Sequence, residues 1–206
     1  MNHGAISVSS LFDAGAIEVV SISNPADIQL RIRSDNASDF AQWFYFRLNG
    51  VKDVDCNLRF LNAGQAAYPE GWHDYQACAS YDRVNWFRLP RTQFDGQELQ
   101  VQVRPAHDTL YVAYFEPYAW ERHLQLIGRA QRDNRVTVLS LGKTLDGHDL
   151  DLLQVGEHTA SKRRIWVTAR QHPGETMAEW FMEGLIERLL DPQDAVGRRL
   201  LEQAAQ

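Results

Sequence analysis

The 206-residue chain has a formal net charge of −6, an apolar fraction of 44% and two cysteines. This composition is that of a globular protein with its own core, and it excludes a disulfide-dependent scaffold. It also excludes the extended basic surface that nucleic acid or an anionic membrane would need. No apolar run is long enough to span a bilayer and the N-terminus is not of the secretory type, which favours a cytoplasmic location.

The first half of the chain reads as a series of short strands separated by turn sequences. Residues 99–103 alternate apolar and polar side chains, as in a strand with one buried face. Steps such as Asn49-Gly50 and Asp95-Gly96 mark turns. The predicted strands cover residues 17–21, 28–33, 40–48, 57–61, 84–89, 98–103 and 110–115. Seven short strands at this spacing predict an antiparallel β-sandwich over residues 1–116.

The pattern changes after Glu116-Pro117, and the following residues read as an α/β region. Helical spacing of apolar residues predicts a helix over 118–132, and Asp146-Gly147 predicts a hairpin between strands 136–141 and 150–155. The β-branched and aromatic run from Ile165 to Ala169 predicts a buried strand that ends near residue 170. Two further helices are predicted, over 175–190 and over 193–203.

The second region is predicted to leave apolar surface uncovered. The helix over 175–190 is apolar on most sides, and a narrow polar stripe, predicted to face solvent, holds Thr176, Glu179, Glu183 and Glu187. A strand as apolar as residues 165–169 belongs inside a sheet, yet only a paired hairpin is available beside it. We therefore expect either a partner that covers this surface or a longer protein of which the chain is a part.

The most informative motif is His172-Pro173-Gly174-Glu175, which lies between the predicted strand and helix. Zinc accepts imidazole nitrogen and carboxylate oxygen, and strand ends in α/β sheets are common places for ligands. Pro173 disfavours helix at His172, Gly174 permits a sharp turn, and Glu175 would sit in the first helical turn. The same residues also fit a purely structural explanation, in which Pro-Gly forms a turn and Glu175 stabilises a helix start.

Other polar groups have commoner structural explanations. Asp146-Gly147-His148-Asp149 fits a hairpin turn, and Trp72-His73-Asp74-Tyr75 fits an exposed aromatic loop, with a binding surface as the alternative. Lys162-Arg163-Arg164 is predicted to be a solvated entry to the next strand. Three further histidines lack a carboxylate or histidine at ligand spacing and are predicted to be structural: His107, His123 and His158.

Several segments together resemble one family. Arg170-Gln171-His172-Pro173-Gly174-Glu175-Thr176 resembles the first zinc-binding segment of the M14 metallocarboxypeptidases, most closely of their cytosolic carboxypeptidase branch. Other segments resemble the β-sandwich that this branch carries ahead of its catalytic domain: Trp43-Phe44-Tyr45-Phe46-Arg47, Ser80-Tyr81-Asp82, Trp86-Phe87-Arg88 and Ala113-Tyr114-Phe115-Glu116-Pro117-Tyr118. The resemblance implies a β-sandwich domain at residues 1–116 and, at 117–206, the incomplete first part of an α/β zinc carboxypeptidase domain.

The resemblance implies a metallocarboxypeptidase that removes C-terminal residues from peptides or proteins, with one zinc ion held by His172 and Glu175. The family's third ligand, its substrate-binding asparagine-arginine pair and its catalytic glutamate have no counterparts here, and no histidine follows His172. We therefore assign no catalytic residue, expect the chain alone to be inactive, and expect the remainder of the domain as a partner. Two alternatives stay open: a zinc deacylase or amidohydrolase of the same fold, and a non-enzymatic protein-binding β-sandwich.

Overall fold

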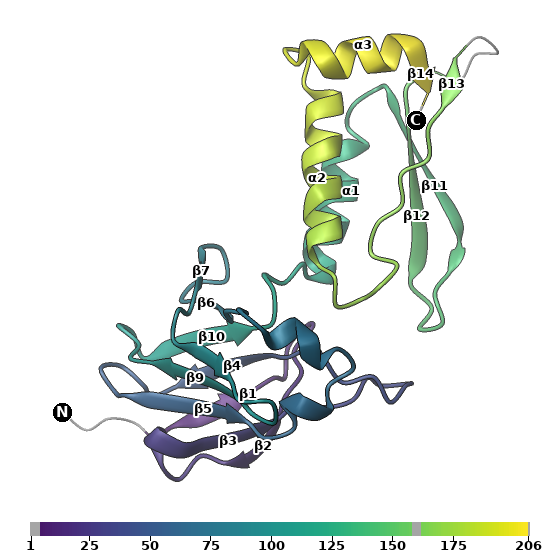
Figure 1. Cartoon of the computed structure of the whole chain (residues 1–206). Coiled ribbons are helices and arrows are strands. Elements are labelled where there is room, and N and C mark those ends of the chain that lie inside the picture. The colour runs from purple at the N-terminus through teal and green to yellow at the C-terminus, as the bar shows by residue number, and fades with distance from the viewer. Residues whose placement is uncertain (1–4, 158–161, 206) are drawn as a thin grey trace. The chain divides into compact units, whose positions relative to one another are not determined.

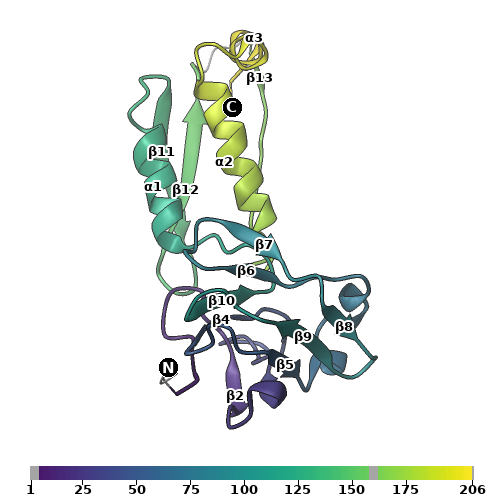
Figure 2. The same cartoon turned by 90° about the vertical axis from the view of Figure 1, so that its left-hand side faces the viewer.

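The computed structural model describes residues 5–157 and 162–205, and Figures 1 and 2 show it from two directions. The chain divides into two compact units, Met1–Pro117 and Tyr118–Gln206. The first unit is built from two β-sheets, and the second combines helices with a β-hairpin. None of the helices described is long and apolar enough to cross a membrane.

The first unit is a sandwich of two five-stranded sheets. One sheet has the order β1-β4-β10-β6-β7 and the other the order β2-β3-β5-β9-β8. The strands of the first sheet are β1 (Ser7–Ser9), β4 (Tyr45–Asn49), β6 (Cys78–Ser80), β7 (Trp86–Arg88) and β10 (Thr109–Ala113). Those of the second are β2 (Glu18–Ser21), β3 (Ile28–Arg31), β5 (Cys56–Phe60), β8 (Thr92–Phe94) and β9 (Leu99–Val103). Short 3-10 turns lie at Pro25–Asp27, Ala63–Gln65 and Pro69–Trp72.

The core of this unit lies between the two sheets. Along β9 the alternation in sequence becomes an alternation in burial, because Leu99 and Val101 are fully buried while Gln102 is exposed. Phe46 of one sheet and Phe60 of the other have ring centroids 6.2 Å apart, within the range of favourable aromatic contact. The predicted β-sandwich is thus confirmed as the fold of the first unit.

Three details of the sandwich differ from the sequence prediction. Strands β1, β6 and β8 were not predicted, because three residues are too few to show an alternating pattern. Residues 40–44 lie outside the strand predicted there, which begins at Tyr45. In addition, β3 pairs with β5 in parallel, so the sandwich is not wholly antiparallel. Pairing direction depends on the connection between strands, which no single strand records.

Trp72 is part of this core and not of an exposed loop. Its side chain is 1% exposed, and its indole Nε1 donates a hydrogen bond of 2.9 Å to the carbonyl oxygen of Ala63. Tyr75 is buried beside it, whereas His73 and Asp74 between them are exposed. The prediction of an exposed aromatic loop is therefore wrong for both aromatic residues, which point into the sandwich.

The second unit contains the helices and the hairpin that the sequence predicts. Helix α1 (Trp120–Ala130) is followed by the antiparallel strands β11 (Val136–Lys143) and β12 (Asp149–Val155), then by α2 (Met177–Leu190) and α3 (Ala195–Gln203). Two-residue strands β13 (Arg163–Arg164) and β14 (Ala204–Ala205) pair in parallel. A small apolar core joins Leu126 of α1, Ile186 of α2 and Leu153 of the hairpin. Figures 1 and 2 show α1 and α2 running side by side near the hairpin.

The turn between α2 and α3 brings the two helices into close contact. A Cβ atom at Gly197 would lie only 2.5 Å from the carbonyl oxygen of Arg188, which is closer than non-bonded atoms approach. Leu201 of α3 packs with Leu189 of α2 and Val155 of β12 in a second apolar cluster. Glycine at position 197 therefore allows α3 to close the end of this core.

The strand predicted over residues 165–169 is not present. Ile165, Trp166 and Val167 belong to no strand and are exposed, Trp166 to 69%. Just before this run, Arg163 and Arg164 form β13, which pairs with β14. Within the described ranges, residues 165–169 pair with no strand. A strand needs a neighbour for its backbone groups, and the sequence of one segment cannot supply that neighbour. The apolar run therefore stays uncovered in this structure.

Candidate metal site

The predicted metal-binding motif forms a tight turn just before α2. The backbone N–H of Glu175 donates a hydrogen bond of 2.9 Å to the carbonyl oxygen of His172, and α2 begins two residues later at Met177. His172 and Glu175 are both exposed. Neither side chain forms a hydrogen bond or ion pair with any residue that the structure describes. One imidazole and one carboxylate, borne by a single turn, are thus available to a ligand.

The chemistry of these two donors fits zinc, although two donors do not complete a site. Zinc in proteins accepts imidazole nitrogen and carboxylate oxygen, and it usually takes three or four protein ligands. Across residues 5–157 and 162–205, no cluster of three or more histidine, cysteine, aspartate or glutamate side chains is arranged to hold a metal ion. Among the described residues, the turn thus presents two donors of types that zinc accepts, without a third beside them.

Arg170 lies two residues before His172 and connects the turn to its surroundings. Its Nε donates a hydrogen bond of 2.7 Å to the carbonyl oxygen of Pro173 inside the turn. Its Nη1 forms an ion pair of 2.6 Å with Glu179 on α2 and a longer hydrogen bond of 3.4 Å with the carbonyl oxygen of Tyr118. The backbone of Arg170 is in the left-handed region, with φ of 63°. No pattern in the sequence indicates these contacts.

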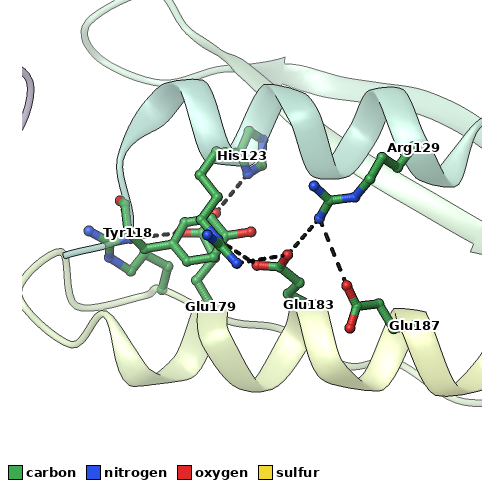
Figure 3. A network of polar contacts seen from close by, with 8 residues as sticks. Tyr118, His123, Arg129, Glu179, Glu183 and Glu187 are labelled. Atoms are coloured by element: carbon green, nitrogen blue, oxygen red, sulfur yellow. Dashed lines mark hydrogen bonds and ion pairs between the residues drawn. The ribbon is translucent and has the colours of Figure 1, made fainter. Parts of the chain in front are cut away.

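Next to the turn, polar side chains fill the space between α1 and α2 (Figure 3). Glu183 of α2 is 5% exposed and accepts hydrogen bonds from Arg122 at 2.8 and 3.2 Å and another from Arg129. The guanidinium of Arg122 also lies 4.0 Å from the ring centroid of Trp180. Burial is the largest single influence and opposes the charge on Glu183, but its hydrogen-bond donors and the positive charges of Arg122 and Arg129 together outweigh it and hold the pKa of this carboxyl below its usual value. Glu183 is therefore a charged bridge between the helices.

These contacts correct the predicted orientation of α2. Its polar stripe was expected to face solvent, yet Thr176 and Glu183 are buried and Glu179 is largely covered. Only Glu187 is exposed, while the apolar Phe181 is 61% exposed. The arginines and histidine of α1 make this arrangement favourable, because a carboxylate can be buried when opposite charges and hydrogen bonds compensate it. Helical periodicity identifies a face but not the side chains that will meet it.

His123 of α1 joins this network through both ring nitrogens. Nδ1 lies 2.8 Å from Glu179 of α2, and Nε2 lies 3.1 Å from Asp151 of β12. The hydrogen bond with Glu179 is the main cause that raises the pKa of His123. Desolvation lowers the pKa, whereas the hydrogen bond with Asp151 raises the pKa further. The two carboxylates lie on opposite edges of the ring and do not converge on one point. His123 is thus a structural link, and its partners are distant in sequence.

This link predicts that the second unit loses stability as pH rises. The folded-state pKa of His123 is raised above its unfolded value of about 6.5, so its stabilising effect is complete below that pH and disappears as pH rises through the folded pKa. Thermal unfolding of the unsubstituted chain and of His123→Gln, measured between about pH 5.5 and 8.5, should show a difference that shrinks with increasing pH. A difference that is independent of pH would contradict a charged His123.

The remaining polar candidates have structural roles. Asp149 forms an ion pair of 2.6 Å with Lys143 across the two ends of the hairpin turn, in agreement with the predicted turn. His107 lies against the ring of Tyr81, with centroids 4.7 Å apart. Lys162 donates a hydrogen bond of 2.9 Å to the carbonyl oxygen of Leu201, so it is tied to α3 and is not only a solvated entry. His158 lies outside the described residues.

Two family models match the chain, one for each unit. The cytosolic carboxypeptidase N-terminal domain matches residues 8–115. The zinc carboxypeptidase family matches residues 120–205, a range that includes His172 and Glu175. Together they cover the β-sandwich and the unit that bears the predicted metal-binding motif.

Relatives agree with both models. A protein of Zymomonas mobilis, described only as uncharacterized, is 46% identical over 199 residues, which cover 97% of this chain and 51% of that protein. Solved metallo-carboxypeptidases from Burkholderia cenocepacia and Pseudomonas aeruginosa match with TM-scores of 0.94 and 0.92 and identities of 48% and 46%. Both matches cover 97% of this chain, and they cover 54% and 53% of the two structures. The Pseudomonas protein was solved in complex with (2-guanidinoethylmercapto)succinic acid.

The chain spans about half the length of these relatives. The matched portion includes the sandwich, the hairpin and the two helices beside the metal-binding motif. Sequence family and tertiary structure therefore lead to one assignment. The chain belongs to the M14 zinc carboxypeptidases and carries the N-terminal domain of their cytosolic carboxypeptidase branch.

Proposed function

We propose that this chain contributes the first part of a zinc carboxypeptidase that hydrolyses the C-terminal peptide bond of peptides or proteins in the cytoplasm. In this proposal residues 1–116 are a β-sandwich domain, and residues 117–206 are the N-terminal part of the catalytic domain. The observation that carries the proposal is the turn before α2, where His172 and Glu175 are exposed and closed into one turn by a 2.9 Å backbone hydrogen bond. Family membership supports it.

His172 and Glu175 would be two ligands of a single zinc ion. Bound zinc supplies a Lewis acid that polarises the scissile carbonyl group and lowers the pKa of a water molecule. The contribution of this chain is to hold the imidazole and the carboxylate on one turn, with the start of α2 directly behind them. A helix N-terminus favours nearby negative charge, which suits a carboxylate at this position.

The proposed site is incomplete within these 206 residues. Two ligands from one turn leave most of the coordination sphere of zinc to water, so affinity should be low. No histidine follows His172, and we assign no general base among the residues present. We propose that the third ligand, the general base and the groups that hold the substrate carboxylate come from the remainder of a carboxypeptidase domain. The chain alone should therefore be inactive.

Titration of the isotope-labelled chain with zinc chloride, followed by NMR, tests the proposed ligands. We expect the ring signals of His172 and the amide signal of Glu175 to shift with weak, fast-exchanging binding. His172→Ala should abolish the shift at Glu175, whereas His107→Ala, which removes an exposed histidine of the first unit, should leave it unchanged. A lack of response at His172 would show that the ligands are wrong. Tight stoichiometric zinc together with peptidase activity would show that the site is complete.

The reaction itself is tested on the intact product of the natural gene, whose mass is measured first. We expect zinc-dependent release of the C-terminal residue from peptides, including peptides that end in glutamate. Preferential turnover of acyl-amino acids would indicate a deacylase of the same fold. Peptide binding without turnover would favour a non-enzymatic β-sandwich module.

A further inference from the structure

Arg170 has a strained backbone conformation. Its φ of 63° lies in the left-handed region, where a side chain with a Cβ atom is disfavoured and glycine or asparagine is usual. A long arginine at such a position persists only when its surroundings stabilise it, and strain of this kind is often found beside functional groups. The residue stands two positions before His172, at the point where the uncovered segment 165–169 enters the metal-binding turn.

The side chain of Arg170 forms the contacts that hold this conformation. Its planar guanidinium makes one hydrogen bond inside the turn, from Nε to the carbonyl oxygen of Pro173 at 2.7 Å. The opposite edge of the same group pairs with Glu179, in the first turn of α2, at 2.6 Å. Because a guanidinium is rigid and forked, these two bonds fix the distance between the turn and the helix.

Glu179 is itself held from the other side. Its second carboxylate oxygen lies 2.8 Å from Nδ1 of His123 on α1, and Nε2 of that ring lies 3.1 Å from Asp151 on β12. The side chains of Glu179 and Asp151 are 13% and 14% exposed, so these bonds are partly shielded from water. The chain of contacts therefore runs from the packed helices and hairpin, through Arg170, to the turn.

We propose that Arg170 is a positioning residue for the metal-binding turn, which it holds in the shape that presents His172 and Glu175 together. The inference rests on the proposed function, because it takes those two residues as zinc ligands. The backbone hydrogen bond between Glu175 and His172 closes the turn. The turn has few other constraints of its own, because residues 165–169 before it belong to no strand. Groups that orient metal ligands typically change metal affinity by 10- to 100-fold when they are removed.

Arg170→Gly tests the proposal without adding backbone strain, because glycine adopts this φ freely. We expect zinc affinity, measured by the NMR titration of His172 in the 206-residue chain, to fall by about 10-fold. Hydrogen exchange at the Glu175 amide should become faster, because the turn loses its link to α2. Arg170→Lys keeps the positive charge but lacks the forked guanidinium group. We therefore expect it to keep the ion pair with Glu179 but to bind zinc less tightly than the unsubstituted chain.

Arg129→Gln is the matched control. It removes an arginine from the same network, where Arg129 pairs with Glu183 one helical turn beyond Glu179, but it does not contact the turn. Zinc affinity should stay within about twofold of the unsubstituted chain, even if thermal stability falls. This control separates positioning of the turn from general loss of stability.

Two results would overturn the inference, and they can be told apart. If Arg170→Gly binds zinc as tightly as the unsubstituted chain and leaves exchange at Glu175 unchanged, Arg170 does not position the turn. If the unsubstituted chain shows no zinc response at His172, the proposed ligands are wrong and the inference fails with them. That second result needs no variant of Arg170.

Discussion

Trp72→Ala is expected to destabilise the first unit by about 4 kcal/mol, the largest effect of any substitution considered. The indole is almost completely buried and packs against Phe44, Tyr75 and Tyr114, with ring centroids 5.2 to 6.4 Å away. Its removal leaves a cavity and also removes one hydrogen-bond donor from the carbonyl oxygen of Ala63, which keeps its 3.1 Å bond from the backbone N–H of Ala66. Urea unfolding followed by far-ultraviolet circular dichroism measures the change.

Phe40→Ala is the matched control for this prediction. Phe40 is an aromatic residue of the same unit, but it is 72% exposed, so its removal should change stability by less than about 0.5 kcal/mol. Trp72→Phe keeps most of the ring and loses the donor, and it should fall between the two. If Trp72→Ala proved as mild as the control, the burial of Trp72 in the sandwich would be wrong.

Glu183→Ala is expected to destabilise the second unit by about 2 kcal/mol. The substitution removes the acceptor of both Arg122 and Arg129 and leaves a gap between α1 and α2. The cost stays below that of a fully buried ion pair, because the side chains of Arg122 and Arg129 are 42% and 49% exposed and can be solvated. Urea is the suitable denaturant, since guanidinium chloride would screen the charges.

Glu187→Ala provides the comparison on the same helix. Glu187 is one turn further along α2, and its side chain is 62% exposed and 4.0 Å from Arg129. Its loss should change stability by less than about 0.5 kcal/mol. Equal effects of the two substitutions would mean that Glu183 is as solvated as the sequence analysis first predicted.

The fold could be predicted from sequence where the signal is local. The alternation in residues 99–103, the Asp-Gly turn of the hairpin and the helical spacing before Asp191-Pro192 each depend on a few neighbouring residues. The parallel pair β3/β5 could not be predicted, because pairing joins residues that are 30 positions apart in the chain, such as Ile28 and Leu58. The apolar run at 165–169 likewise predicted a strand, but these residues pair with no strand that the structure describes.

For the candidate site, the sequence predicts two metal ligands, and their role stays a prediction, but it does not predict the residues around them. His172-Pro173-Gly174-Glu175 combines side chains of types that zinc accepts with residues that favour a turn. Four consecutive residues are therefore enough to indicate the motif. Arg170 lies two residues before this motif. Its role could not be inferred, because a positive φ and the contacts with Pro173 and Glu179 depend on how the chain folds back on α2.

By itself, the sequence determined the order of the main elements, the sandwich and the position of the turn before α2, because backbone preferences and apolar periodicity act over short distances. The tertiary structure alone decided which charged groups meet. Glu179 and His123 are 56 residues apart in the chain but 2.8 Å apart in space. Hydrogen bonds and ion pairs depend on distance, and the packing of α1 against α2 is what sets that distance.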